Sequence, residues 1–257
     1  MHPTLIQIGD LHIRTYGFFV ALGFLAGIFI AKYEAKITGE DPEKIMDLAF
    51  YILISSIIGA RIFYITVNLK FFMENPLEIF KIWHGGLVFY GGFIFALIIS
   101  TVYMKQKKMR TAKTLDILAP SLAAGQFFGR LGCLSAGCCY GKSCDLPWAV
   151  IFTSPESLAP TGGYLHPTQL YHALGNLCIF SFLWFFRNKK KFDGHIFWLY
   201  VLLYGAARFV IEFFRGDFRG ETFFGVLSLA QVIGCFSAIT AIIMIIILNK
   251  GKKSSAI

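Results

Sequence analysis

Charged side chains are scarce in this chain. Asp, Glu, Lys and Arg make up 15% of its 257 residues, and hydrophobic residues make up 56%. An ordinary globular chain carries about 25% charged residues. The mean hydropathy is +0.63, and apolar runs of about twenty residues recur, each long enough to cross a bilayer as a helix. This composition excludes a water-soluble domain and predicts an all-α, multi-pass membrane protein.

The apolar runs also lack the two-residue alternation of a transmembrane barrel strand, so we exclude a β-barrel. No small-residue cleavage site follows the first run, and we expect no cleavable signal peptide. We predict seven membrane-spanning helices in a single membrane domain, with the fifth beginning a few residues before its apolar run. The predicted spans are about 16–37, 46–67, 83–104, 114–135, 171–187, 194–215 and 225–248.

The basic residues do not gather on one soluble face. The formal net charge is +9, which would suit nucleic acid only if the basic residues formed such a face. Instead, most of them follow the odd-numbered runs, as in Lys105–Lys113 and Arg187–Lys191. Positive loops face the cytoplasm. We therefore exclude nucleic-acid binding and expect an extracytoplasmic N-terminus and a cytoplasmic C-terminus in a bacterial inner (plasma) membrane.

Four arginines fall within or at the edges of the apolar runs: Arg61, Arg130, Arg208 and Arg215. A charge at mid-bilayer costs about 2.5–3.5 kcal/mol on insertion scales, and such residues usually face a cavity or a partner. The alternative is that each side chain extends from a helix end to the lipid headgroups. Because these arginines cluster with other polar residues, we favour a functional polar cavity.

The fourth run ends in the richest segment of the chain. Gly125, Gly129 and Gly132 recur at helical spacing and predict close packing against a neighbouring helix. From about 136 to 170 the chain is polar and rich in glycine, which membrane depth tolerates only around protein or a watery cavity. We expect an extracytoplasmic segment there, with Arg130 at its mouth suited to holding a lipid phosphate.

The sixth run carries a polar stripe of four residues. Tyr204, Arg208, Glu212 and Arg215 are spaced four, four and three apart and would share one helix face. One interpretation is a structural ion pair between Arg208 and Glu212. The other, which we favour because Arg130 offers a partner, is a phosphate-binding arginine held by its glutamate.

Histidines open two further runs. His84 precedes the paired glycines of the third run, which permit close approach of a ligand or helix. His166 and His172 flank the start of the fifth run, where Pro167 suits a first helical turn. Each imidazole can exchange a proton near neutral pH, although a lone interfacial histidine is more often a plain hydrogen-bonding group.

Over nearly its full length the chain resembles the prolipoprotein diacylglyceryl transferase family. The matching stretches are Ile13-Arg-Thr-Tyr-Gly17, Gly59-Ala-Arg-Ile-Phe-Tyr64, Trp83-His-Gly-Gly86, Gly125-Gln-Phe-Phe-Gly-Arg-Leu-Gly132, His166-Pro-Thr-Gln-Leu-Tyr171 and Tyr204-Gly-Ala-Ala-Arg-Phe-Val-Ile-Glu-Phe-Phe-Arg215. The resemblance implies transfer of the diacylglyceryl group of phosphatidylglycerol to the lipobox cysteine of a preprolipoprotein, which yields a thioether and glycerol phosphate. It implies neither a metal nor an organic cofactor; membrane lipids are further partners.

The resemblance also implies site residues. Arg130 and Arg208 match two essential arginines of the family, and Tyr16, Gly141, Tyr204 and Glu212 fall on motif positions. Our catalytic candidates are Arg130, Arg208, His172, Tyr90 and Tyr16. Our substrate-binding candidates are Arg130, Arg208, Glu212, Tyr204, Gly141 and His84.

The chain departs from the family pattern at four positions. Tyr90 stands where the family has a histidine proposed as the base, and Cys133 replaces an asparagine. Cys138 takes the place of an acidic residue, and His172 replaces a glutamate. Tyrosine, with an ordinary pKa near 10, is a poor base. We therefore predict that His172 accepts the thiol proton.

Four of the six cysteines lie within twelve residues: Cys133, Cys138, Cys139 and Cys144. An oxidising compartment favours disulfides there. Reactive thiol chemistry beside Arg130 is a second interpretation. A metal site is a third, although adjacent cysteines do not match the usual ligand spacing, and inert small residues are a fourth. We expect the two remaining cysteines, Cys178 and Cys235, in the core.

The clustered cysteines are the basis for an alternative to the transferase function. A divergent relative could retain the lipid-phosphate site and bind lipid, or use its thiols for redox or other group-transfer chemistry.

Overall fold

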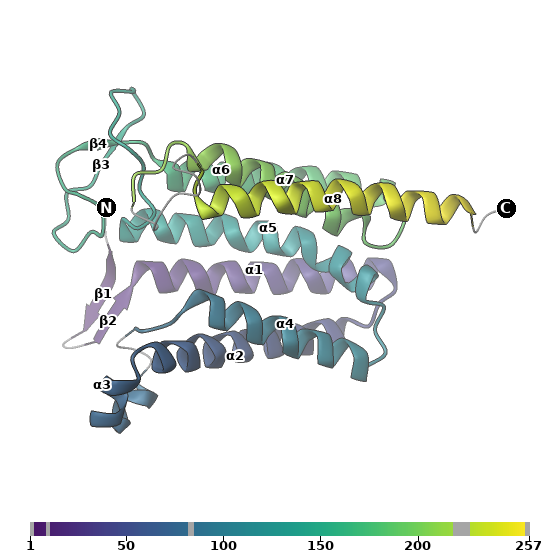
Figure 1. Ribbon diagram of the computed structural model, residues 1–257, viewed down its shortest axis with the longest axis horizontal. Helices are drawn as coiled ribbons and strands as arrows, with labels where there is room; N and C mark the ends of the chain where they lie inside the picture. The colour runs from purple at the N-terminus through teal and green to yellow at the C-terminus, as the bar shows by residue number, and fades with distance from the viewer. Residues whose placement is uncertain (1–2, 9–10, 82–84, 218–226, 255–257) are drawn as a thin grey trace. The chain divides into compact units, whose positions relative to one another are not determined.

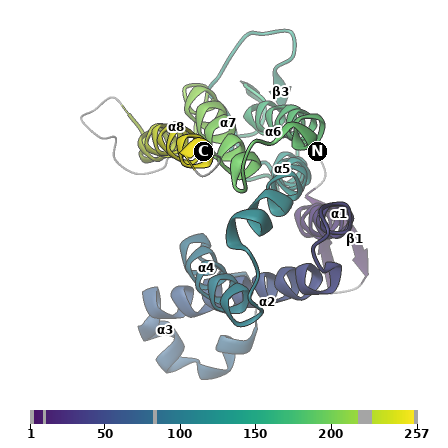
Figure 2. The ribbon, with the colours of Figure 1, turned by 90° about the vertical axis from the view of Figure 1, so that its right-hand side faces the viewer.

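The structure is a computed structural model that describes residues 3–8, 11–81, 85–217 and 227–254. Contacts divide the chain into two compact units, one of Met1–Ile30 with Leu115–Ile257 and one of Ala31–Thr114. Figures 1 and 2 show the elements of both units.

Within the described ranges, seven long helices coincide with the predicted runs. They are α1 (Thr15–Thr38), α2 (Pro42–Val67), α4 (Phe89–Gln106), α5 (Thr111–Ala136), α6 (Thr168–Phe186), α7 (His195–Glu212) and α8 (Leu229–Ser254). The short elements are β1 (Thr4–Ile8), β2 (Leu11–Arg14), α3 (Leu69–Glu74), η1 (Pro76–Phe80), β3 (Val150–Ile151), β4 (Tyr164–Leu165) and η3 (Arg187–Lys189). β1 pairs with β2, and β3 with β4, both antiparallel.

Six of the long helices in this described part are long and apolar enough to cross a membrane: α1, α2, α5, α6 with η3, α7 and α8. The helix outside that set is α4, whose last turn carries Lys105 and Gln106. The chain is thus a helical, multi-pass membrane protein. The expected early start of the fifth helix is confirmed, because α6 begins at Thr168.

Two predicted helix ends are wrong for local reasons. α4 begins at Phe89 rather than near 83, because Gly85 and Gly86 have φ angles of +84° and +77°, outside the helical region. α7 ends at Glu212 rather than 215, because Arg215 pairs with Gly141 as an isolated β-bridge. The predicted four-residue stripe therefore continues past the helix end.

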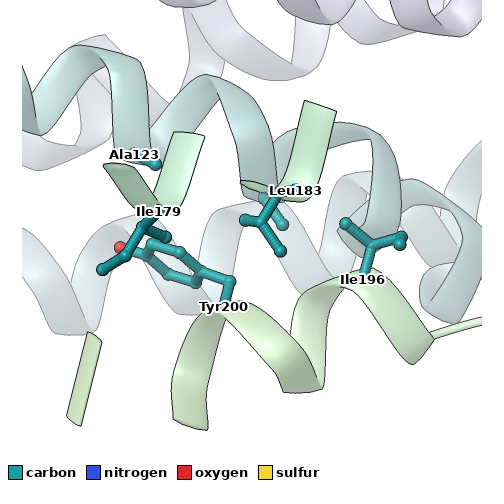
Figure 3. Close-up of a cluster of buried hydrophobic side chains, with 6 residues drawn as sticks. Ala123, Ile179, Leu183, Ile196 and Tyr200 are labelled. Carbon is teal, nitrogen blue, oxygen red and sulfur yellow. The ribbon is translucent and has the colours of Figure 1, made fainter. Parts of the chain in front are cut away.

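In the first unit, α5, α6 and α7 share a hydrophobic core. Its buried members are Ala119, Ala123, Ile179, Leu183, Ile196 and Tyr200, and Figure 3 shows Tyr200 beside Ile179 between these helices. The start of α7 is held by buried Asp116 of α5, which accepts hydrogen bonds from the backbone N–H groups of Gly194 (2.9 Å) and Phe197 (3.0 Å).

Glycines set the close helix contacts of this unit. A Cβ on Gly205 of α7 would lie 2.8 Å from the carbonyl oxygen of Gly234 in α8. A Cβ on Gly23 of α1 would lie 2.8 Å from that of Gly125 in α5. Such small residues let helix backbones approach. The predicted packing is confirmed for Gly125 and Gly132 but wrong for Gly129, around which an added Cβ would meet open space.

In the second unit, α2 and α4 pack through glycines. A Cβ on Gly91 would lie 2.5 Å from the carbonyl oxygen of Gly59, and one on Gly92 would lie 2.8 Å from that of Ser56. Arg61 of α2 is buried and donates to the carbonyl oxygens of Ile79 (3.0 Å), Gly85 (2.7 Å) and Gly86 (3.2 Å), and also to that of Glu78. This arginine fixes the loop between the helices, which is a structural task.

The two lone cysteines are not in the core as expected. Cys178 of α6 and Cys235 of α8 are both exposed. They share this surface with apolar side chains such as Leu174 and Phe236. Such a surface suits lipid contact, where a small apolar thiol meets no penalty.

Candidate active site

The candidate site lies at one end of the first unit. There α5 ends, α6 begins, α7 ends and α8 begins, and Figure 1 shows these termini close to β3 and β4. Arg130, His172 and Arg208 come from three different helices to this end.

Arg208 lies between a histidine and a carboxylate. Its Nη1 is 3.0 Å from His172 Nε2, and its Nη2 is 3.0 Å from Glu212 Oε2. Only 12% of the Arg208 side chain and 4% of the Glu212 side chain are exposed. Ser228 Oγ donates to Glu212 Oε1 (3.2 Å). The predicted ion pair is confirmed, and its carboxylate is fixed from a second helix terminus.

The contact with Arg208 fixes the tautomer of His172. A guanidinium only donates hydrogen bonds, so Nε2 of His172 accepts, and the proton of the neutral ring is on Nδ1. His172 is buried and lies in the electrostatic field of Arg130, Arg208 and Arg215. In this arrangement the imidazole orients Arg208.

Arg215 follows α7 and forms a two-pronged pair with Asp217. Nε is 2.9 Å from Asp217 Oδ1, and Nη2 is 2.7 Å from Oδ2. Nε also lies 3.9 Å from Glu212 Oε2. Burial alone would lower the pKa of Arg215, but the hydrogen bonds with Asp217 and Cys139 raise it. This guanidinium stays charged and is committed to internal partners.

Arg130 differs from Arg208 and Arg215 in its surroundings. It is half-buried in the last turns of α5, and within the described residues it has no ion pair or hydrogen-bonded side-chain partner. Glu212 and Asp217 compensate Arg208 and Arg215, so Arg130 leaves the site with positive charge. An incoming anion would find an unpaired guanidinium there.

The end of α5 brings three of the four clustered cysteines together. The sulfur atoms of Cys133, Cys138 and Cys139 all lie within 4.8 Å of one another. Cys144 lies elsewhere, with its backbone N–H donating to the carbonyl oxygen of Tyr164 (3.1 Å). All six cysteines are free thiols in this structure.

The loop of Cys138 and Cys139 is held by α6 and by Gly141. Thr168 Oγ1 donates to the carbonyl oxygen of Cys139 (2.7 Å), and Gln169 Nε2 donates to that of Cys138 (2.9 Å). Cys139 has a φ angle of +63°, which is uncommon for a residue with a side chain. The loop therefore holds a conformation that its neighbours impose.

Charges and hydrogen bonds within the cluster distinguish the two adjacent thiols. Hydrogen bonds from Cys133 and Cys138, together with the nearby Arg215, lower the pKa of Cys139. Hydrogen bonding to Cys133 and Cys139, and burial, raise the pKa of Cys138. Of the two adjacent thiols, Cys139 is therefore the one with the lower pKa.

Three other predicted residues surround this centre. Tyr16 lies in the first turn of α1, is 45% exposed, and is near Arg130 and the cysteines. Tyr204 lies one turn before Arg208 and stacks on Tyr200, with ring centroids 5.8 Å apart. Gly141 packs against backbone, since an added Cβ would lie 2.5 Å from the carbonyl oxygen of His166.

Two predicted residues belong to the second unit or lie outside the described residues. Tyr90 belongs to the second unit, where it is 57% exposed in the first turn of α4. His84 lies outside the described residues. His166 contacts Tyr171, with Nδ1 3.1 Å from the phenol oxygen.

Sequence reasoning missed four polar residues that hold the site: Ser228, Asp217, Thr168 and Gln169. Ser228 had a signal, because it forms a capping box with Gln231 at the start of α8. Gln169 and Thr168 are fully buried polar residues in a motif that we had interpreted only as a helix start. Asp217 had no signal beyond its closeness to Arg215.

Comparisons with known proteins agree on one family. Residues 3–247 match the family described as prolipoprotein diacylglyceryl transferase. A protein of Clostridium tetani named phosphatidylglycerol–prolipoprotein diacylglyceryl transferase is 39% identical over 242 residues, which cover 94% of this chain and 96% of the relative. A Clostridium perfringens protein named phosphatidylglycerol–prolipoprotein diacylglyceryl transferase 2 is 34% identical over 256 residues, covering 99% of both chains.

Proposed function

The chain belongs to the prolipoprotein diacylglyceryl transferase family, and we propose that it transfers the diacylglyceryl group of phosphatidylglycerol to a prolipoprotein. The observation that carries the proposal is the arrangement of Arg208, 12% exposed and held by Glu212 and His172, in one site with Arg130, which has no ion-pair partner among the described residues. The products are a thioether and glycerol phosphate.

The two arginines would hold the lipid phosphate. Among the described residues Arg130 has no ion-pair partner, and its planar fork matches phosphate oxygens in pairs. Arg208 is oriented by His172 and Glu212 and would share the anion with Arg130. Positive charge placed where the leaving phosphate gains charge lowers the barrier of such a step. Tyr16 and Tyr204 would line this headgroup site.

The acceptor is the thiol of the lipobox cysteine, which must be a thiolate to attack. We assign His172 as the acceptor of this proton, on the condition that Arg208 first leaves Nε2. Nε2 is occupied by Arg208 in the free protein, so it becomes available only when Arg208 turns to the phosphate. Until then, His172 positions the arginine.

We also propose seven membrane-spanning helices in a single bacterial inner-membrane domain, which are the six apolar helices named above and α4. Its 18 residues extend about 27 Å, close to the thickness of the hydrocarbon core. The uninterrupted family match over 3–247 supports one domain. The positive loops support an extracytoplasmic N-terminus and a cytoplasmic C-terminus, so the 136–170 segment would be extracytoplasmic and close to membrane lipids.

The clustered free thiols favour the second candidate function, a lipid-binding relative that uses its cysteines for redox or other group-transfer chemistry. One assay distinguishes transferase activity from this alternative function. The purified protein is placed in phosphatidylglycerol vesicles with a lipobox peptide, and the mass gain of the peptide is measured.

We expect the wild type to modify the peptide and Arg130→Gln to lose at least about 100-fold in rate. The matched control is Arg14→Gln, because Arg14 is an exposed surface residue paired with Glu156. Wild-type protein that binds the vesicles but never modifies the peptide would favour the alternative function.

A further inference from the structure

Three thiols that the proposed reaction leaves unused meet at the end of α5. The sulfur atoms of Cys133, Cys138 and Cys139 are mutually within 4.8 Å. Thiolates bind Zn²⁺ at about 2.3 Å, so sulfurs that share one tetrahedral ion lie about 3.8 Å apart. Small side-chain rotations would bring these three sulfurs to that separation.

The backbone around the sulfurs is already fixed. The left-handed conformation of Cys139 (φ +63°) places its sulfur beside the other two, although Cys138 precedes it directly. Fully buried Thr168 and Gln169 hold the carbonyl oxygens of both residues. A site with so little backbone freedom loses little entropy when it binds an ion.

The surrounding charge suits a thiolate-bound metal. Three thiolates with one Zn²⁺ carry a single negative charge, and Arg215 hydrogen-bonds to Cys139. The positive charge of Arg130, which lies about one turn before Cys133 in α5, also acts on the Cys133 thiol. These guanidinium groups would compensate the complex without supplying a competing ligand, because they only donate hydrogen bonds.

The proposed reaction also has a need that such an ion would meet. The acceptor must be a thiolate, yet Nε2 of His172 already accepts a hydrogen bond from Arg208. A thiol that coordinates a metal is deprotonated outright. Three protein ligands leave the open fourth position that is typical of catalytic rather than structural zinc sites.

We propose that Cys133, Cys138 and Cys139 bind one Zn²⁺ whose fourth position takes the thiolate of the acceptor cysteine. This rests on the proposed transferase function, and it departs from the absence of a cofactor that the family resemblance implies. The site would hold the nucleophile next to the arginines that hold the phosphate.

The step balances without an oxidant or reductant. The acceptor thiol releases its proton to Nε2 of His172, which Arg208 has left for the phosphate, as its sulfur binds Zn²⁺. The sulfur electron pair then forms a bond to the terminal glyceryl carbon of the diacylglyceryl group, while the carbon–oxygen bond to phosphate breaks. Glycerol phosphate leaves with the electron pair of the broken carbon–oxygen bond. The neutral thioether is a weaker ligand than a thiolate, so the product dissociates.

The first experiment measures metal binding alone. The full chain, purified in detergent under reducing conditions, is titrated with Zn²⁺ and, separately, with Cd²⁺, whose thiolate charge-transfer absorption reports the ligands. We expect one ion per chain and at least about 100-fold weaker binding in Cys133→Ser, Cys138→Ser and Cys139→Ser. The matched control is Cys144→Ser, which should bind as the wild type does, because Cys144 lies outside the cluster.

A second variant covers the case in which the serine variants fail to fold. Cys133→Asn with Cys138→Glu introduces the residue types that the family carries at these positions, and it should fold without binding Zn²⁺. Wild-type binding in this variant, or in the single serine variants, would overturn the proposal. So would a disulfide among the three cysteines that persists in protein purified without reductant and excludes the ion.

The second experiment separates this site from the transferase function. In the vesicle assay, a chelator should reduce peptide modification at least about tenfold and added Zn²⁺ should restore it. Full activity of metal-free protein would overturn the zinc-bound thiolate and leave the transferase function standing. No activity in any metal state would refute the transferase function, while the titration alone still decides the metal site.

Discussion

Replacement of Glu212 by Gln tests whether the buried ion pair serves the phosphate or only the fold. The carboxylate of Glu212 lies 3.0 Å from Arg208 and 3.9 Å from Arg215, and Ser228 donates to its other oxygen. Gln keeps the shape and the contact with Ser228 but removes the negative charge. Arg208, whose side chain is 12% exposed, then loses its carboxylate partner and keeps the contact with the neutral imidazole of His172.

The magnitude follows from the exposure of the pair. At an effective dielectric constant of 20, two charges 3.0 Å apart attract by roughly 5 kcal/mol. Breaking a buried pair by removal of one partner destabilises a protein by about 3–5 kcal/mol. For a chain of this size that range corresponds to a fall in Tm of at least about 6 °C. Loss of orientation should also lower kcat/KM at least about tenfold.

The double variant Glu212→Gln with Arg208→Gln distinguishes the two explanations. It removes both charges, so we expect Tm to return most of the way to the wild-type value. Activity in phosphatidylglycerol vesicles should stay at least about 100-fold down, because the phosphate has lost a guanidinium. If activity recovers together with Tm, the pair serves only the fold, and the assignment of Arg208 to the phosphate is refuted.

Three further predictions concern other parts of the molecule. His172→Gln keeps a hydrogen-bond acceptor for Arg208 but removes the proposed proton acceptor, so kcat/KM should fall at least about tenfold, as in His172→Leu. Activity of His172→Gln within about threefold of the wild type would show that His172 only positions Arg208. Gly205→Ala should destabilise the protein by about 1–3 kcal/mol in thermal unfolding, since its Cβ would meet α8 at 2.8 Å, and Gly129→Ala, with open space around it, should not. Reporter fusions after Lys108 and Lys190 should be cytoplasmic and fusions in the loop before β4 extracytoplasmic; two external signals from the basic loops would contradict the topology.

The sequence predicted the long helices well because the bilayer leaves few alternatives. An apolar run of about twenty residues must satisfy its backbone hydrogen bonds internally, and a helix does so. The ends were less predictable, because they depend on single residues. Gly85 and Gly86 hold φ angles that delay α4 to Phe89, and a bridge from Arg215 to Gly141 ends α7 at Glu212.

Contacts within one helix of the site were predictable, and contacts between helices were not. Arg208 and Glu212 are four residues apart, so their pairing follows from helix geometry alone. The contact of Arg208 with His172 spans 36 residues of sequence and depends on how α6 packs against α7. No spacing rule reports that packing, so the engagement of Nε2 became known only from the structure.

The sequence also could not predict how the clustered cysteines lie relative to one another. Consecutive side chains usually point apart, so Cys138 and Cys139 did not match the spacing of a metal site. The left-handed backbone of Cys139 changes that relation and adds its sulfur to the group. Its φ angle is imposed by the hydrogen bonds of Thr168 and Gln169, which come from a helix about thirty residues away.

The departures from the family pattern have a spatial relation that their sequence positions conceal. Cys133, Cys138 and His172 are spread over forty residues, yet all three belong to the first unit and surround the arginines. Independent drift would scatter substitutions over surfaces of little consequence. The resemblance implies an amide and two carboxylates at these positions, where this chain has two thiols and an imidazole around the proposed phosphate site. Because Cys139 lies beside these thiols, the proposed zinc site needs all three cysteines together, so Cys133→Asn alone should already weaken Zn²⁺ binding.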